Sequence, residues 1–358
     1  MVFPPRRAAR AKAAGWTAML ASIIATLALA FVPSPYVVEL PGPTFDALGS
    51  TESGPLIEIE GQETYETDGE LRLLTVSLMG NPSNALTWVQ VAEAYLSPSR
   101  SFLPIDLVYP PGTDVEQSNE QGQIEMQNSQ SSAIAAALLH EGFEFEADVT
   151  VADIIPGLPA EGVLQAEDRI LTVNGAPVYD AYSIRTAIAE RGSGVASDVE
   201  FVRDGETQTV SLTPRDEDGA LVIGVYLQNE FTFPFDVTIQ LPNVGGPSAG
   251  MMFALGIIDS LTPGSLTNGE HWAGTGTITA QGDVGPIGGI VQKMYGARDA
   301  GAEYFLAPIA NCNEVVGNIP SGLEVFEVTT LDDAILAIET VASGGDLSDL
   351  PRCAAVVP

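Results

Sequence analysis

Residues 236–259 read DVTIQLPNVGGPSAGMMFALGIID, a strand pattern, a glycine-rich turn and an apolar helix pattern in direct succession. Gly246 permits backbone geometries closed to other residues, and Pro247 at a helix start sacrifices no hydrogen bond. Ser248 then lies where free N–H groups and the helix dipole favour negative charge. Residues 251–258 are apolar on every side, which predicts a buried helix. A serine that merely caps a helix is the alternative interpretation.

Lysine usage singles out a second residue. The chain has two lysines, Lys12 and Lys293, against twelve arginines. Lys293 shares the i, i+3, i+4, i+7 stripe of Ile290, Met294 and Ala297, so its amine is expected to face the core. Burial lowers the pKa of a lysine and suits it to general-base work, whereas arginine stays protonated. The alternative is a surface lysine that extends its amine into water.

These residues lie in a run of motifs that resembles the proteolytic domain of Lon proteases. The resemblance is clear over residues 236–342 and weaker over 56–140, and the spacing from Ser248 to Lys293 is close to that of the family. The motifs are GGPSAG at 245–250, TGTIT at 275–279 and GDVGPIGG at 282–289, followed by Lys293.

The resemblance implies a Ser-Lys dyad. Ser248 would be the nucleophile, Lys293 its general base, and Thr275 the hydrogen-bond partner of the lysine amine. Gly246 and Pro247 would shape the oxyanion loop. Gly245 departs from the family, which often has an acid there, so a changed site shape or regulation is expected.

No GxxxxGK[ST] motif occurs, so the ATP-driven engine of Lon proteases is not expected within these residues. The resemblance therefore implies an ATP-independent endopeptidase of the secreted bacterial Lon-like type, with no cofactor and no metal. Its substrates would be proteins or peptides, and the analogy extends to a homo-oligomer.

A second resemblance lies between the two halves of the first. Residues 142–215 resemble a PDZ domain, and Asn174-Gly175 is a hairpin turn between apolar runs. Such a domain adds a peptide strand to its sheet edge, and the loop at Gly142 and Phe143 is expected to capture a carboxylate. A purely structural β domain is the alternative. The motifs are PGLPA at 156–160, EDRIL at 167–171 and VNG at 173–175.

The N-terminus has the pattern of a membrane anchor. Residues 13–33 are uncharged and about long enough to span a bilayer. Every charged side chain before Glu39 is basic, so a cytoplasmic N-terminus and an extracytoplasmic body are expected at the cell membrane. A signal peptide cleaved after Ala30 is the alternative.

Composition limits partners and compartment. A net charge of −33 argues against nucleic acid, which needs clustered basic residues. Cys312 and Cys353 form no CxxC motif, which argues against a zinc site. In an exported body the two cysteines predict one disulfide that ties the tail to the preceding domain.

The predicted fold class is α+β, a Lon-type domain with an inserted PDZ-like β domain behind one transmembrane helix. Strands are expected at 56–60 and 71–78, helices at 84–96 and 129–140, and a loop at 104–126. The predicted segments are a cytoplasmic tail at 1–12, the membrane helix at 13–33, a first Lon-like half at 34–141, the PDZ domain at 142–215, the proteolytic domain at 216–345 and a C-terminal tail at 346–358.

Three alternative functions make other demands on the sequence. A Ser-His-Asp hydrolase would need His140 or His271, but the lysine interpretation accounts for more residues. A signal peptidase would share the Ser-Lys chemistry but not this glycine-rich run. An inactive membrane-anchored PDZ scaffold is the remaining alternative, although intact Ser248, Thr275 and Lys293 argue against it.

Overall fold

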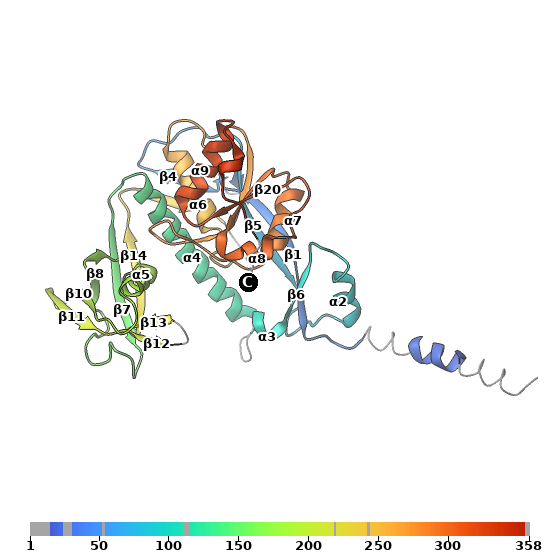
Figure 1. The fold of residues 1–358 in the computed structure, drawn as a ribbon, viewed down its shortest axis with the longest axis horizontal. Coiled ribbons are helices and arrows are strands. Elements are labelled where there is room, and N and C mark those ends of the chain that lie inside the picture. Colours follow the sequence, from blue (N-terminus) through green and yellow to red (C-terminus); the bar gives the residue numbers. More distant parts are fainter. Residues whose placement is uncertain are drawn as a thin grey trace, which may run out of the picture.

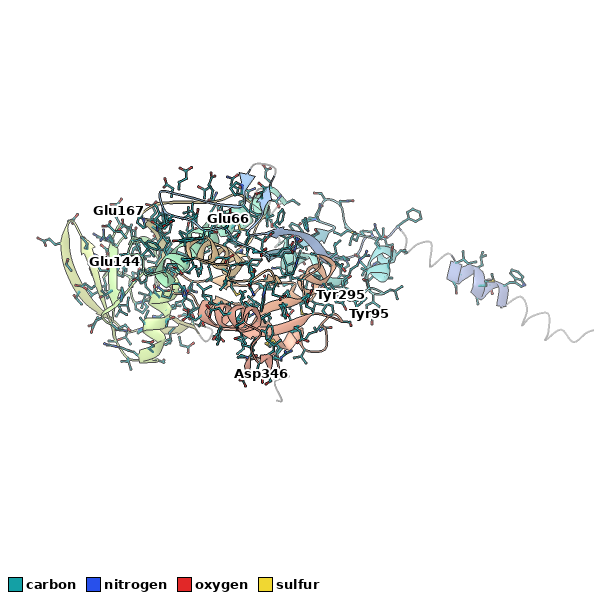
Figure 2. All side chains as sticks on the ribbon, turned by 90° about the horizontal axis from the view of Figure 1, so that it is seen from above. Glu66, Tyr95, Glu144, Glu167, Tyr295 and Asp346 are labelled. Carbon is teal, nitrogen blue, oxygen red and sulfur yellow. A yellow bond between two sulfur atoms is a disulfide. The ribbon has the colours of Figure 1, made fainter. Side chains whose placement is uncertain are left out.

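The computed structural model describes residues 15–23, 31–51, 54–109, 115–217, 220–241 and 244–354. The chain folds into two units beside each other, as Figure 1 shows. We call residues 142–232 the small unit, and residues 31–141 together with 233–354 the large unit. The small unit therefore interrupts the large unit in sequence. Figure 2 shows Glu144 and Glu167 at the small-unit end of the body, and Tyr95 at the opposite end.

A six-stranded mixed sheet forms the centre of the large unit, in the order β20-β19-β16-β5-β1-β6. Strands β5, β16, β19 and β20 run parallel, whereas β1 is antiparallel to β5 and β6. The predicted strand at 71–78 is confirmed as part of β5. The bounds are β1 (Tyr36–Asp46), β5 (Glu70–Met79), β6 (Ser101–Pro104), β16 (His271–Gly274), β19 (Tyr304–Pro308) and β20 (Glu324–Val328).

Helices cover both faces of this sheet, because successive strand residues point to opposite sides. Leu73 packs with α4, α6 and α9, whereas Leu74 packs with α7 and α8 on the other face. The predicted buried helix at 251–258 is confirmed, since all of α6 except Ser260 is buried. The bounds are α2 (Trp88–Ala94), α3 (Ile105–Val108), α4 (Val115–His140), α6 (Gly250–Leu261), α7 (Ile290–Asp299), α8 (Cys312–Val315) and α9 (Leu331–Ala342).

The predicted loop at 104–126 is wrong over most of its length. Helix α3 begins at Ile105, and the long helix α4 already begins at Val115. Residues 115–125 are mostly Glu, Gln, Ser and Asn without an apolar stripe, so the sequence pattern alone gives no sign of burial. The helix is held there by contacts with residues far away in sequence, which are described below.

The small unit is a β sheet with one helix, in the order β11-β10-β8-β7-β14. The predicted hairpin turn is confirmed: Asn174 and Gly175 both have positive φ and join β8 to β9. The sheet continues through β14, beyond the predicted boundary at residue 215. The bounds are β7 (Glu146–Ile154), β8 (Arg169–Val173), β9 (Ala176–Pro177), α5 (Ala181–Arg191), β10 (Ser197–Arg203), β11 (Glu206–Leu212), β12 (Arg215–Glu217), β13 (Ala220–Val222) and β14 (Val225–Thr232).

Short elements complete the chain. The strand pattern before the glycine-rich turn is confirmed as β15, which pairs with β4 in the first part of the large unit. These elements are β2 (Ser50–Thr51), β3 (Gly54–Pro55), β4 (Ile57–Glu60), β15 (Asp236–Ile239), β17 (Thr277–Ile278), β18 (Val284–Gly285) and the 3-10 turns η1 (Ile309–Asn311) and η2 (Leu347–Asp349).

The predicted membrane segment, residues 13–33, falls only in part on described residues. Residues 15–23 are helical, whereas 13–14 and 24–30 lie outside the described ranges. Within those ranges, no helix combines the length and the apolar character needed to cross a bilayer.

Candidate active site

Ser248 lies in the turn that joins β15 to α6, immediately before the helix begins at Gly250. Gly246 has a φ of +86°, a backbone conformation that other residues rarely adopt. The turn places Ser248 at the N-terminal end of a twelve-residue helix, where the helix dipole favours negative charge. The local fold therefore follows from the Gly-Pro-Ser sequence itself.

Lys293 reaches this serine from the opposite side. It lies on α7, where the predicted apolar stripe is confirmed by the burial of Ile290, Met294 and Ala297. Its Nζ lies 2.7 Å from Ser248 Oγ. Lys293 is 3% exposed. The structure therefore brings Ser248 and Lys293 together, with the lysine amine almost fully shielded from water.

Thr275 completes a three-residue arrangement. Lys293 Nζ lies 2.9 Å from Thr275 Oγ1, and that hydroxyl donates to the backbone carbonyl of Ser248 at 2.9 Å. With its proton given to that carbonyl, the threonine oxygen accepts from the lysine. The amine is thereby held against Ser248 Oγ by a fully buried neighbour.

Burial lowers the pKa of Lys293 to about 7, and the Glu39 carboxylate acts in the opposite direction. Part of the lysine population is therefore neutral near pH 7 and has a lone pair for a proton. Lys293 and Glu39 line a cleft of about 500 Å³ in front of Ser248. The rest of the cleft is formed by residues of β5 such as Val76, by Met126 of α4 and by the turn at 244–249. The dyad therefore borders a cleft and not a closed interior.

The source of the oxyanion donors differs from the expectation for Gly246 and Pro247. The N–H of Gly246 already donates to the Gly122 carbonyl at 2.8 Å, and proline has no N–H. In the described part of the chain, no backbone partner is found for the N–H of Ser248. Ser248, with Ala249 next to it at the helix start, is therefore the donor that could hold an oxyanion.

The two histidines lie elsewhere. His140 Nδ1 contacts Asp332 at 3.1 Å, and His271 Nδ1 contacts Glu70 at 3.1 Å. Both side chains are substantially exposed. The hydroxyl of Ser248 has the lysine amine as its neighbour instead, so the geometry gives no histidine base to this serine.

Gly142 and Phe143 do not provide a carboxylate site. Both N–H groups donate to the last turn of α4, to the carbonyls of Leu139 and Leu138. The Phe143 ring packs edge-on against Phe235 at 5.2 Å, and both partly buried rings pack against the core of the large unit. The expectation fails because this glycine ends a helix, a role that a helical pattern followed by glycine also predicts.

The sheet edge at β14 was missed in the sequence. Along the described strands, β14 pairs with β7 on one side and ends the sheet on the other. The alternation in VYLQNEFT is the signal that could have found it.

Cys312 and Cys353 form a disulfide, with their Cα atoms 4.9 Å apart. Among the described residues, one group of potential metal ligands occurs, Cys312, Cys353 and Glu327. Because two of its three members are joined in the disulfide, this group supplies no thiolate to a metal. The pair thus ties residue 353 to the start of α8.

Ser248 and Lys293 both fall within one stretch of the chain that matches a known family. Residues 226–340 match the Lon protease (S16) C-terminal proteolytic domain. Residues 120–213 match the PDZ domain family, a match that begins inside α4 and stops before β14. The chain therefore combines, in a mixed α/β architecture, a region similar to the Lon proteolytic domain and a region similar to PDZ domains.

The curated relatives that this chain matches are Lon proteases. Lon protease 1 of Sorangium cellulosum is 38% identical over 107 residues, which are 28% of this chain and 13% of that protein. Lon protease of Azospirillum brasilense is 37% identical over the same shares. Lon protease 2 of Bacillus subtilis is 32% identical over 104 residues, 28% of this chain and 18% of that protein. The chain thus matches less than a fifth of the length of these relatives.

The solved structures that are similar cover about a fifth of this chain. The PDZ domain of the SdrC-like protein from Listeria monocytogenes is 23% identical, with a TM-score of 0.20, over 22% of this chain and 85% of that chain. A solution structure from Geobacillus thermodenitrificans is 29% identical, with a TM-score of 0.19, over 20% of this chain and 84% of that chain.

Proposed function

We propose that this chain is a serine endopeptidase in which Ser248 is the nucleophile and Lys293 the general base. One observation carries the proposal: the buried amine of Lys293 lies 2.7 Å from Ser248 Oγ. This pair borders a cleft and lies in a region similar to the Lon proteolytic domain. Arginine could not replace this lysine, because a base must give up its proton near neutral pH.

The proposed reaction follows the positions of these groups. Neutral Lys293 takes the proton of Ser248 Oγ as that oxygen attacks the scissile carbonyl. The N–H of Ser248 at the start of α6 stabilises the oxyanion. The lysine then returns the proton to the leaving amine, and water hydrolyses the acyl-enzyme by the same route in reverse. Throughout the reaction, the hydroxyl of Thr275 holds the amine of Lys293 beside Ser248 Oγ.

Substrates and location are part of the proposal. Proteins and peptides that are already unfolded would be cleaved without ATP, and residues 1–358 contain no GxxxxGK[ST] motif that would bind it. Basic residues before the apolar run at 13–33 support a membrane anchor with the body outside the cytoplasm. A disulfide between Cys312 and Cys353 is consistent with an oxidising compartment.

A labelling experiment tests the function. Purified protein is treated with a fluorophosphonate, and hydrolysis of an unfolded protein is followed with and without ATP. We expect stoichiometric labelling at Ser248, and hydrolysis that ATP does not change. A protein that neither labels nor cleaves would favour the inactive scaffold, and stimulation by ATP hydrolysis would contradict the second part.

The rate of hydrolysis is expected to rise with pH and to level off above a midpoint near 7. The reason is that burial lowers the pKa of Lys293 to about 7, and only its neutral form can accept the proton of Ser248. Glu39→Gln should move the midpoint to lower pH, because it removes a carboxylate that raises this pKa. The measurement is kcat/KM against pH for both proteins. A flat profile between pH 6 and 9 would exclude Lys293 as the base.

We also propose that the small unit recruits substrates by strand addition, at the edge of β14 rather than at Gly142 and Phe143. The inactive variant Ser248→Ala should bind peptides with a free apolar C-terminus at least about tenfold more tightly than the amidated forms, the scale on which a charge-assisted hydrogen bond acts. Fluorescence anisotropy measures both affinities. Equal affinities would remove carboxylate recognition from the proposal.

A further inference from the structure

Helix α4 packs against the turn at residues 244–249, which carries Ser248 and which we call the nucleophile turn. The carbonyl of Gly122 accepts from the N–H of Gly246 at 2.8 Å. The hydroxyl of Ser129 donates to the carbonyl of Pro247 at 2.8 Å. Gly122 and Ser129 are seven residues apart, so they lie on one face of the helix, two turns from each other.

The helix and the turn approach each other closely at a pair of glycines, and it is the glycine of the turn that the approach requires. A Cβ at Gly245 would lie 3.1 Å from the backbone carbon and 3.2 Å from the Cα of Gly122. A Cβ at Gly122 would have its nearest neighbour at 3.5 Å, an ordinary contact distance. Gly245 is the position where the resemblance to Lon proteases leads one to expect an acid, and a side chain there would need the turn or α4 to shift by a few tenths of an ångström.

The carbonyl of Pro247 accepts from the hydroxyl of Ser129 at 2.8 Å and, more weakly, from the N–H of Gly250 at 3.4 Å, so the shorter bond from Ser129 helps to set which way this peptide group points. The carbonyl of Pro247 and the N–H of Ser248 belong to the same planar trans peptide, so they point in opposite directions. Because Ser129 holds this carbonyl toward α4, the N–H of Ser248 points away from α4. That N–H is the group proposed to hold the oxyanion.

We infer that α4 clamps the nucleophile turn and that Ser129 is a positioning residue, which orients the Ser248 N–H through the Pro247 carbonyl. The inference rests on the proposed function. Ser129 is 5% exposed, and a Cβ at Gly250 would lie 2.8 Å from its oxygen, so the hydroxyl is enclosed between α4 and the first turn of α6. Ser129 does not itself line the cleft, and its hydroxyl acts through the backbone carbonyl of Pro247, a residue that does.

The test compares Ser129→Ala with Ser131→Ala, a matched change on the same helix at a partly exposed serine. Ser129→Ala should lower kcat about tenfold, less than the loss of an entire oxyanion donor, which costs about a hundredfold or more. KM and the pH midpoint should stay unchanged, because the side chain of Ser129 does not line the cleft and is not a hydrogen-bond partner of Lys293. Ser131→Ala should match the wild type.

A glycine pair gives a second, independent test of the clamp. Gly245→Ala should lower kcat, because the turn must move away from Gly122 to admit the new methyl group. Gly122→Ala should keep full activity, since its methyl group meets only ordinary contacts. Fluorophosphonate labelling rates are measured beside kcat, and melting temperatures show that each variant is folded.

The outcomes separate the clamp from the proposed function. If Ser248→Ala destroys activity but Ser129→Ala keeps wild-type kcat and labelling rate, the clamp is wrong and the protease stands. A change confined to KM or to the melting temperature would likewise reduce Ser129 to a structural residue. If wild-type protein neither cleaves nor labels, the proposed function itself fails.

Discussion

Replacing Lys293 by arginine is expected to abolish peptide hydrolysis while the protein still folds. The guanidinium remains protonated at every working pH, so it cannot accept the proton of Ser248. The loss in kcat should be roughly 10⁴-fold or more, the scale seen when one member of a catalytic unit is removed. The measurement is kcat/KM on a fluorogenic peptide, with circular dichroism to show that the fold is retained.

The matched control is Lys293→Met, which keeps the length and the apolar stem of the side chain. It should be as inactive as the arginine variant. It should also unfold at a higher denaturant concentration than Lys293→Arg, because a buried amine is costly and a buried guanidinium more so. If Lys293→Arg retains a tenth of wild-type turnover or more, another group takes the proton and the dyad is wrong.

The geometry of the candidate site could be anticipated because local rules and distant contacts agree there. Gly246 and Pro247 determine the turn before α6 by their own backbone preferences. The stripe of Ile290, Met294 and Ala297 turns Lys293 toward the core. Each prediction needed only one short segment, and the motifs supplied the pairing between segments.

The elements that were missed depend on partners far away in the chain. The first half of α4 has no apolar stripe, and its contact with the nucleophile turn joins Gly122 to Gly246, far apart in the chain. Strand β14 reads as a strand, but its pairing with β7 across the whole small unit is not readable from the segment itself. Helix and strand periodicity report burial on one face and cannot show which distant backbone provides it.

The C-terminal segment is a second case in which the local sequence pattern does not predict contacts with distant residues. Residues 346–358 have little apolar periodicity, yet Leu350 is buried and the N–H of Glu327 donates to the Pro351 carbonyl at 3.1 Å. The guanidinium of Arg352 lies over the Phe326 ring at 5.1 Å and contacts Glu324. The described part of the tail, residues 346–354, is therefore docked on β20 next to the disulfide, although the sequence alone would leave it frayed.

Removing this disulfide is expected to lower the free energy of unfolding by about 3–4 kcal/mol, as the chain-entropy model gives for a loop closed by cysteines 41 residues apart. Cys353→Ser is the variant of choice, because Cys353 is partly exposed whereas Cys312 is buried. Leu350 and Arg352 keep their contacts, so the tail should stay docked. The loss then comes mainly from the freer unfolded chain, and urea unfolding measures it.

The control is wild-type protein unfolded in the presence of a reductant, which should reproduce the stability of Cys353→Ser without reductant. Agreement within about 0.5 kcal/mol would show that the bond, and not the substituted side chain, carries the effect. Natively exported protein should also take up no alkyl group unless it is first reduced. Two alkyl groups per chain without reduction would remove the bridge and, with it, the support that it gives to a body outside the cytoplasm, where disulfides persist.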